Sequence, residues 1–167
     1  MQEIDPNMIV PAVFGIAGTV VGAVVTGASV FLSEWWKDKK KSAQIRASLI
    51  AEVDALVEIA NKREYLQGLL KTRDYLKTQP EGTRYSYTVR IPDHYSRIYQ
   101  ANADSIGSID SETACKIVQF HQFVDAVVQD VLPGGSLHVG GNIDNYEQTA
   151  NILEHALNLG REISNDK

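Results

Sequence analysis

A run of 25 uncharged residues, Met8 to Leu32, constrains this 167-residue chain more than any other feature. A helix rises about 1.5 Å per residue, so a helical run of this length measures roughly 37 Å, against about 30 Å for the hydrocarbon core of a bilayer. A buried helix of a soluble protein is usually shorter and carries a polar face. We therefore predict a transmembrane helix over residues 8–32, preceded by a short periplasmic N-terminus of residues 1–7.

A cleavable signal peptide is the main competing interpretation of this run. Signal peptides begin with a basic segment and contain a shorter apolar stretch. Here the first seven residues include Glu3 and Asp5 and contain no lysine or arginine. A permanent anchor is therefore favoured over a removable signal.

The residues that follow the run predict its orientation. Residues 34–48 hold five basic and two acidic side chains, and basic residues beside a span stay on the cytoplasmic side. We predict a single-pass protein with its N-terminus outside and its C-terminus inside. Tryptophan favours the headgroup layer, and lysine there attracts anionic lipids. The residues expected at this membrane interface are Trp35, Trp36, Lys37, Lys39, Lys40 and Lys41.

Small and hydroxyl-bearing residues recur along one face of the predicted span. Gly18 and Gly22 form a small-xxx-small pair, which lets two helix backbones approach closely in lipid. A whole face of such residues is stronger evidence than a single match. We predict that the chain forms a homo-oligomer through a small-residue stripe made of Gly15, Gly18, Thr19, Gly22, Thr26 and Ser29.

The rest of the chain is acidic and contains one cysteine. Residues 49–167 carry 11 basic and 17 acidic side chains, which argues against a nucleic-acid partner because phosphate binding needs a basic face. The lone Cys115 excludes an internal disulfide and suits a reducing compartment. This composition and length leave room for one modest domain beside the anchor.

Residues 33–78 read as a long juxtamembrane helix, because apolar residues recur there at spacings of three and four. No proline interrupts the pattern before Pro80. A parallel coiled coil is an alternative, but the apolar stripe is wider than a coiled-coil seam. Packing against later helices of the same chain is favoured. The stripe consists of Ile45, Leu49, Val53, Leu56, Ile59, Ala60, Leu66 and Leu70.

Residues 79–92 are expected to form an extended loop, since a lone strand would have no partner. Residues 93–167 should add a helical hairpin and a C-terminal helix that complete the bundle. Asp93 is expected to cap a helix over residues 94–106, and Asp110 a helix over residues 111–132. A last helix should run to about residue 163.

The start of that last helix is assigned to Asp144 and Glu147, which stand at capping-box spacing. Its expected inward residues are Tyr146, Ala150, Leu153, Leu157 and Ile163. Several amphipathic helices cannot each bury an apolar face alone. We therefore predict an all-α protein, with one transmembrane helix, a long juxtamembrane helix and a small cytoplasmic helical bundle.

The segment RIYQANADSIGSIDSETACKIVQFHQF, from Arg97 to Phe123, resembles an uncharacterised bacterial and prophage family of single-pass, membrane-anchored helical proteins. His121 departs from the pattern, in which an aromatic residue is expected. The resemblance implies an anchored helical architecture at the bacterial inner membrane and implies no activity. Its matching positions are Asn102, Ile106, Gly107, Asp110, Ile117, Val118 and Phe120.

Candidate chemistry is sparse. His121 and Asp125 lie one helical turn apart, a spacing that suits a metal or an oriented general base. His121 also lies on the apolar face, so a core or interface histidine is favoured. Cys115 lies six residues from His121, on a different helix face, which disfavours a thiolate pair. His94, His138 and His155 are scattered and form no cluster at metal-ligand spacing.

The glycine-rich stretch PGGSLHVGGN, residues 133–142, is the one candidate phosphate loop. It lacks the Lys-Ser or Lys-Thr pair of a P-loop and is expected to be a flexible connection. Arg90 and His94 are too closely spaced for the Arg/His motif of helical ribonuclease-type domains. We assign no catalytic, cofactor-binding or metal-binding residue, and we do not predict an enzyme.

Two function classes remain. The first is a membrane-anchored interaction protein that scaffolds or regulates an unidentified protein partner, in contact with membrane lipids. The alternative is an oligomeric membrane-acting effector, for example in phage exclusion or defence, whose spans form a pore or perturb the bilayer. The alternative requires the small-residue stripe, whereas the first class only permits it.

Overall fold

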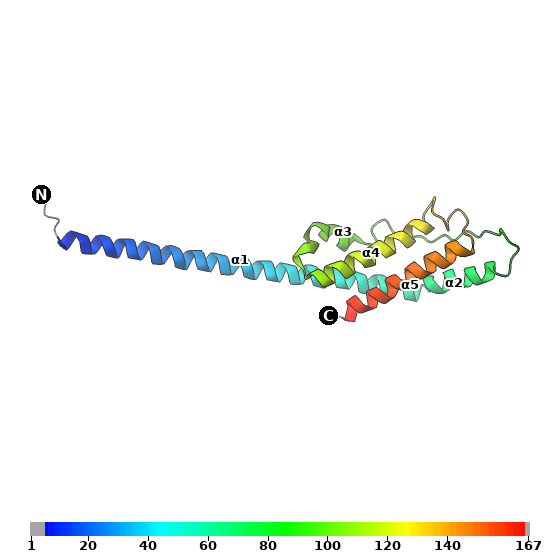
Figure 1. Ribbon diagram of the computed structural model, residues 1–167, viewed down its shortest axis with the longest axis horizontal. Helices are drawn as coiled ribbons and strands as arrows, with labels where there is room; N and C mark the ends of the chain where they lie inside the picture. The colour runs from blue at the N-terminus through cyan, green and yellow to red at the C-terminus, as the bar shows by residue number, and fades with distance from the viewer. Residues whose placement is uncertain (1–5, 166–167) are drawn as a thin grey trace. The chain divides into compact units, whose positions relative to one another are not determined.

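The computed structural model describes the backbone of residues 6–165 and the side chains of residues 31 and 33–165. Every regular element in this part of the chain is a helix, and one isolated β-bridge joins Tyr85 to Gly141. The predicted all-α fold is therefore confirmed for the described residues. In chain order the elements are α1 (Pro6–Lys62), α2 (Tyr65–Leu76), α3 (Arg97–Asn102), the 3-10 helix η1 (Ala103–Ser108), α4 (Ser111–Val131) and α5 (Ile143–Asn165) (Figure 1).

The chain divides into two compact units, residues 1–42 and 43–167, and α1 contributes residues to both. The predicted span over residues 8–32 and its small-residue stripe lie outside the described side chains. Among the helices that could be assessed, none is long and apolar enough to cross a membrane. The second unit contains the helical bundle.

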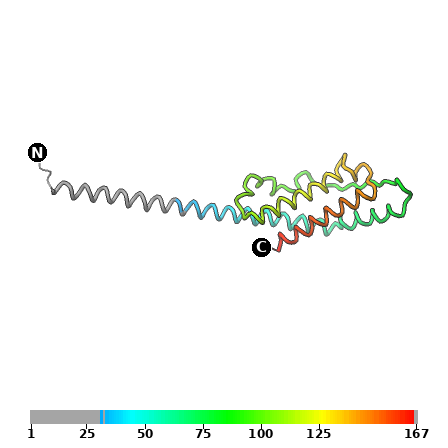
Figure 2. Tube along the Cα trace, in the orientation of Figure 1, coloured from blue at the N-terminus to red at the C-terminus, as the bar shows by residue number. Residues whose placement is uncertain are grey.

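Residues 77–96, here called the strap, connect the end of α2 to the start of α3 without regular structure and run back along α4 (Figure 2). The strap is fixed near one end to the loop between α4 and α5. Tyr85 and Gly141 exchange two backbone hydrogen bonds of 3.0 and 2.8 Å, and the Tyr87 N–H donates to the Leu137 carbonyl. The predicted extended loop is thus an ordered segment.

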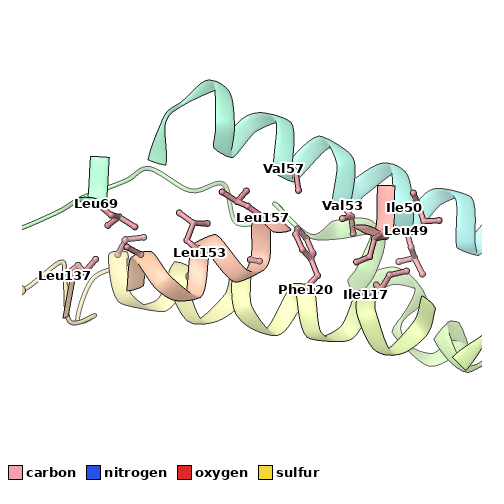
Figure 3. Close-up of a cluster of buried hydrophobic side chains, with 14 of the residues drawn as sticks. Leu49, Ile50, Val53, Val57, Leu69, Ile117, Phe120, Leu137, Leu153 and Leu157 are labelled. Carbon is pink, nitrogen blue, oxygen red and sulfur yellow. The ribbon is translucent and has the colours of Figure 1, made fainter. Parts of the chain in front are cut away.

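The core of the bundle lies where α1, α4 and α5 meet (Figure 3). Leu49, Val53 and Val57 stand four residues apart on α1, so one face of that helix is buried. Ile117 and Phe120 of α4 are buried in the same cluster. The five residues predicted to face inward on the last helix are all buried: Tyr146, Ala150, Leu153, Leu157 and Ile163.

Asp130 organises the turn between α4 and α5. Its carbonyl accepts the backbone N–H groups of Leu137 and His138, at 3.0 and 3.2 Å. Its carboxylate accepts the hydroxyls of Ser136 and Thr149, at 2.8 and 2.7 Å. One side chain therefore connects the end of α4, the loop and the first turns of α5.

The predicted long helix over residues 33–78 is divided by the structure. Glu64 adopts a left-handed backbone conformation, with φ 54° and ψ 35°, so α1 ends at Lys62 and α2 begins at Tyr65. This conformation costs a residue with a side chain about 1–2 kcal/mol. No glycine or proline stands at this position, so the sequence contains no local signal for the break. The break lets α2 pack against α5.

The helix predicted over residues 94–106 is also shorter than expected. Asp93 does not cap it: α3 begins at Arg97 and passes into η1 after six residues. The cap comes instead from Glu52 of α1, whose two carboxylate oxygens accept the N–H groups of Ile98 and Tyr99, each at 2.7 Å. A cap supplied by a residue so distant in the chain leaves no local sequence signal.

Of the other two predicted helix starts, the cap of α4 is confirmed and the cap of α5 is formed by different residues. Asp110 caps α4 by accepting the Thr113 N–H at 2.8 Å, as predicted. The capping box of α5 is formed by Asn142 and Asn145 instead of Asp144 and Glu147. Each asparagine accepts the backbone N–H of the other, at 2.9 and 3.1 Å. Asparagine caps a helix as well as aspartate does, so the observed capping box lies two residues before the predicted one.

Candidate functional site

An apolar cavity of about 410 Å³, partly open to the surface of the bundle, lies between the end of α1, α4, α5 and the strap. Its wall is almost wholly hydrocarbon. Helix α4 contributes Val124 and Val127, and the strap contributes Val89 and Ile91. Further lining residues are Leu56 and Ala60 of α1 and Leu153, Ala156 and Leu157 of α5. This volume falls within the range of small-molecule sites, about 300–1,000 Å³.

The sequence builds this cavity by placing small branched residues where larger ones would fill the core. Val124, Val127 and Val128 occupy the inward face of α4 but are only half-buried, whereas Ile117 and Phe120 nearer its start are fully buried. On the strap, alternate residues turn inward, since Tyr87, Val89 and Ile91 are half-buried and line the cavity. This period-two alternation is the sequence signal that could have predicted which strap residues line the cavity.

A few polar groups stand at the edge of the apolar cavity. Arg63 and Arg90 line it and are exposed, and Arg63 donates to the Tyr65 hydroxyl at 3.2 Å. The Tyr95 hydroxyl donates to the Asp125 carboxylate. Burial raises the pKa of Asp125, because an apolar surrounding disfavours the charged carboxylate.

A second group of titratable residues surrounds His121, which is fully buried. Its ring stacks on Tyr99, with centroids 3.9 Å apart, and Nε2 lies 3.8 Å from a carboxylate oxygen of Glu52. Neither ring nitrogen has a hydrogen-bond partner among the described residues. Burial lowers the pKa of His121 to about 4, so the ring is neutral at physiological pH.

His121 and Asp125, which lie one helical turn apart, contact different partners in the structure. Asp125 binds Tyr95, and His121 faces Tyr99 and Glu52. His121 therefore belongs to the core, as the favoured interpretation held. Within the described residues, no group of three or more His, Cys, Asp or Glu side chains is placed to hold a metal ion.

The remaining candidates are accounted for structurally. Cys115 is exposed on α4, away from the buried His121. The glycine-rich loop serves as the turn between α4 and α5. At Gly135 a side chain would meet the Gln129 carbonyl at 2.0 Å, so the tight turn itself requires this glycine.

The residues predicted at the membrane interface are exposed on α1. Trp35 and Trp36 form an edge-to-face pair with centroids 5.6 Å apart. Lys39 places its ammonium 4.0 Å from the centre of the Trp35 ring, a cation–π contact. Lys37, Lys40 and Lys41 are likewise exposed.

In comparisons with models of known families, with curated proteins and with solved structures, nothing matches this chain. The site must therefore be interpreted from its own residues. The apolar cavity was missed by sequence reasoning, because it depends on the strap crossing helices that lie far from it in the chain.

Proposed function

We propose that this protein is a membrane-anchored interaction protein. In this proposal, residues 8–32 cross the bacterial inner membrane once, with residues 1–7 outside. The helical bundle of residues 43–165 lies in the cytoplasm, where it scaffolds or regulates a protein partner. The resemblance of residues 97–123 to single-pass prophage proteins agrees with this arrangement but supplies no activity.

The observation that carries the proposal is the surface of α1 directly after the uncharged run. Trp35 and Trp36 are 43% and 66% exposed, an unusual state for large aromatic residues in water. Lysines flank them, and each lysine near an anionic membrane surface contributes about 1 kcal/mol of attraction. Exposed tryptophan with lysine is the composition of a lipid headgroup layer.

Three titratable groups of the bundle contribute to its internal structure. Glu52 caps α3, His121 is sealed in the core, and Asp125 is bound by Tyr95. Glu52 and Asp125 hold α3 and the strap by hydrogen bonds, and His121 packs against Tyr99. The rigid bundle that results suits a domain that presents a surface to a protein partner.

Self-association of the span is a separate part of the proposal. Close contact along Gly18 and Gly22 would allow van der Waals packing and interhelical hydrogen bonds, which drive helix association in lipid. The hydroxyl groups of Thr19, Thr26 and Ser29 on the same face also favour the second candidate function, an oligomeric membrane-acting effector. The effector candidate requires the helices to meet along this stripe, whereas the interaction-protein candidate only permits it.

Substitution of the stripe tests this part. Gly18→Leu combined with Gly22→Leu should abolish most cross-linked oligomer of the full-length protein, because bulky side chains keep the backbones apart. Each interhelical hydrogen bond lost with the contact is worth roughly 0.6–2 kcal/mol. Membrane insertion is measured separately by resistance to alkaline extraction.

The control is Val20→Leu combined with Val24→Leu, which keeps the opposite face hydrophobic and should leave the oligomer intact. If the glycine variant cross-links like the parent, the stripe is incidental. The effector candidate then loses its support, and a simple anchor with a cytoplasmic interaction domain remains.

A further inference from the structure

We infer that the apolar cavity binds the hydrocarbon chain of a single-chain amphiphile with a carboxylate head group, a fatty acid of about twelve carbons in chemical class. This inference goes beyond the proposed function. It concerns the bundle alone and holds whether or not residues 8–32 span a membrane. Its failure is therefore distinguishable from failure of the anchor.

The composition of the wall selects a hydrocarbon ligand. Apolar wall surface gains free energy when a hydrocarbon ligand covers it and removes it from water, and the cavity offers about 410 Å³ for such a ligand. A methylene group is about as large as a water molecule, which occupies roughly 30 Å³ in the liquid. The cavity thus has room for about a dozen carbon atoms, enough for one acyl chain and too few for the two chains of a phospholipid.

The charge at the edge of the cavity selects an anionic head group. Arg63 and Arg90 both line the cavity, and neither forms an ion pair with a carboxylate of the described residues. Acidic residues outnumber basic ones in the bundle, so carboxylates of the chain itself are abundant and yet none within the described part pairs with these two arginines. A planar guanidinium binds a carboxylate through two parallel hydrogen bonds. A fatty acid would supply that carboxylate where its chain leaves the cavity.

The strap forms a wall that can move aside to admit the chain. It is held near one end by the bonds of Tyr85 and Tyr87 to the loop between α4 and α5. At the other end, Glu52 binds Ile98 and Tyr99, just beyond the strap. Between Tyr87 and Tyr95 the described backbone makes no hydrogen bond to a helix. Outward movement of this part breaks only side-chain contacts.

Photo-cross-linking of the purified full-length protein tests the inference, and it does not depend on membrane insertion. The probe is a twelve-carbon fatty acid with a diazirine near the end of its chain, and labelled residues are located by mass spectrometry. We expect labels on cavity residues such as Val124, Val127 and Leu153. A fatty alcohol probe of the same length should label these residues at least fivefold less, because it lacks the carboxylate.

Two variants sharpen the test. Val127→Trp places a bulky ring in the cavity, obstructs the path of the acyl chain and should reduce labelling at least fivefold. Arg63→Gln combined with Arg90→Gln removes the head-group contacts and should reduce labelling by a similar factor. Both arginines are exposed, so this variant should fold even if the tryptophan variant does not. The matched control, Lys71→Gln combined with Arg97→Gln, removes the same charge from exposed positions outside the cavity and should label like the parent.

The inference is overturned if the acid probe labels only residues outside the cavity, or if a folded Val127→Trp variant labels like the parent. Equal labelling by the acid and the alcohol, or unchanged labelling of the arginine variant, overturns the carboxylate assignment. A phospholipid probe that labels the cavity as efficiently as the free acid overturns the single-chain assignment.

Discussion

His121 is a titratable residue that the fold holds in its neutral form. The ring is fully buried against Tyr99, and its two nitrogens lack hydrogen-bond partners among the described residues. Protonation would place a charge in this apolar site, and the nearby Glu52 carboxylate is already engaged by two backbone N–H groups. Burial therefore dominates, and it lowers the pKa of His121.

This shift predicts a loss of stability in mild acid. The pKa of His121 is about 4 in the folded state and 6.5 when unperturbed. The unfolded state thus binds more protons between these values, and the free energy of unfolding falls as the pH drops from about 6.5 to about 4. The loss at pH 5 should be about 2 kcal/mol relative to neutral pH. It can be measured by urea unfolding at pH 7 and pH 5.

His121→Phe should keep the stacking on Tyr99, match the parent at pH 7 and lose this part of the pH dependence. The exposed His155 gives the control, because His155→Phe should retain the parent's response. Asp125, whose pKa is raised by burial, acts in the opposite direction, but it is common to all three proteins and cancels from the comparison. An unchanged acid response in His121→Phe would show that His121 is not the responsible group.

At the scale of elements, local signals located the helices and tertiary contacts set their ends. The Asp110 cap and the buried face of α5 were predictable, because capping and a 3.6-residue period are encoded within a few residues. The break at Glu64 and the cap of α3 by Glu52 were not, because each depends on packing between distant segments. The cavity was not predicted for the same reason. The alternation of residues along the strap did indicate which strap side chains face inward.

Gly160 tests the close packing of α5 on its neighbours. A methyl group at this position would lie 2.4 Å from a Val57 methyl and 2.8 Å from the Phe120 ring. Gly160→Ala should therefore lower the free energy of unfolding by about 1–3 kcal/mol, although alanine is the better helix former. Gly107→Ala is the control, since nothing lies within 4 Å of a methyl group there. Equal stability of the two variants would mean that α5 packs less closely than the structure indicates.

At the scale of the whole molecule, the account combines an anchor proposed from sequence with a bundle described by the structure. The bundle begins at residue 43, soon after the exposed tryptophans and lysines of α1. Hydrogen bonds of Glu52 and Asp130 connect its elements, and the apolar cavity lies between α1, α4, α5 and the strap. The orientation of the bundle relative to the membrane is the central claim of this account.

The single cysteine allows that orientation to be measured directly. Cys115 is exposed on α4, within the part of the chain proposed to be cytoplasmic. A membrane-impermeant maleimide should leave the full-length protein unlabelled in intact spheroplasts and label it after permeabilisation. Glu3→Cys in a Cys115→Ser background should show the reverse, with labelling in intact spheroplasts. Labelling of Cys115 in intact spheroplasts, or recovery of the protein in the soluble fraction, would contradict the account.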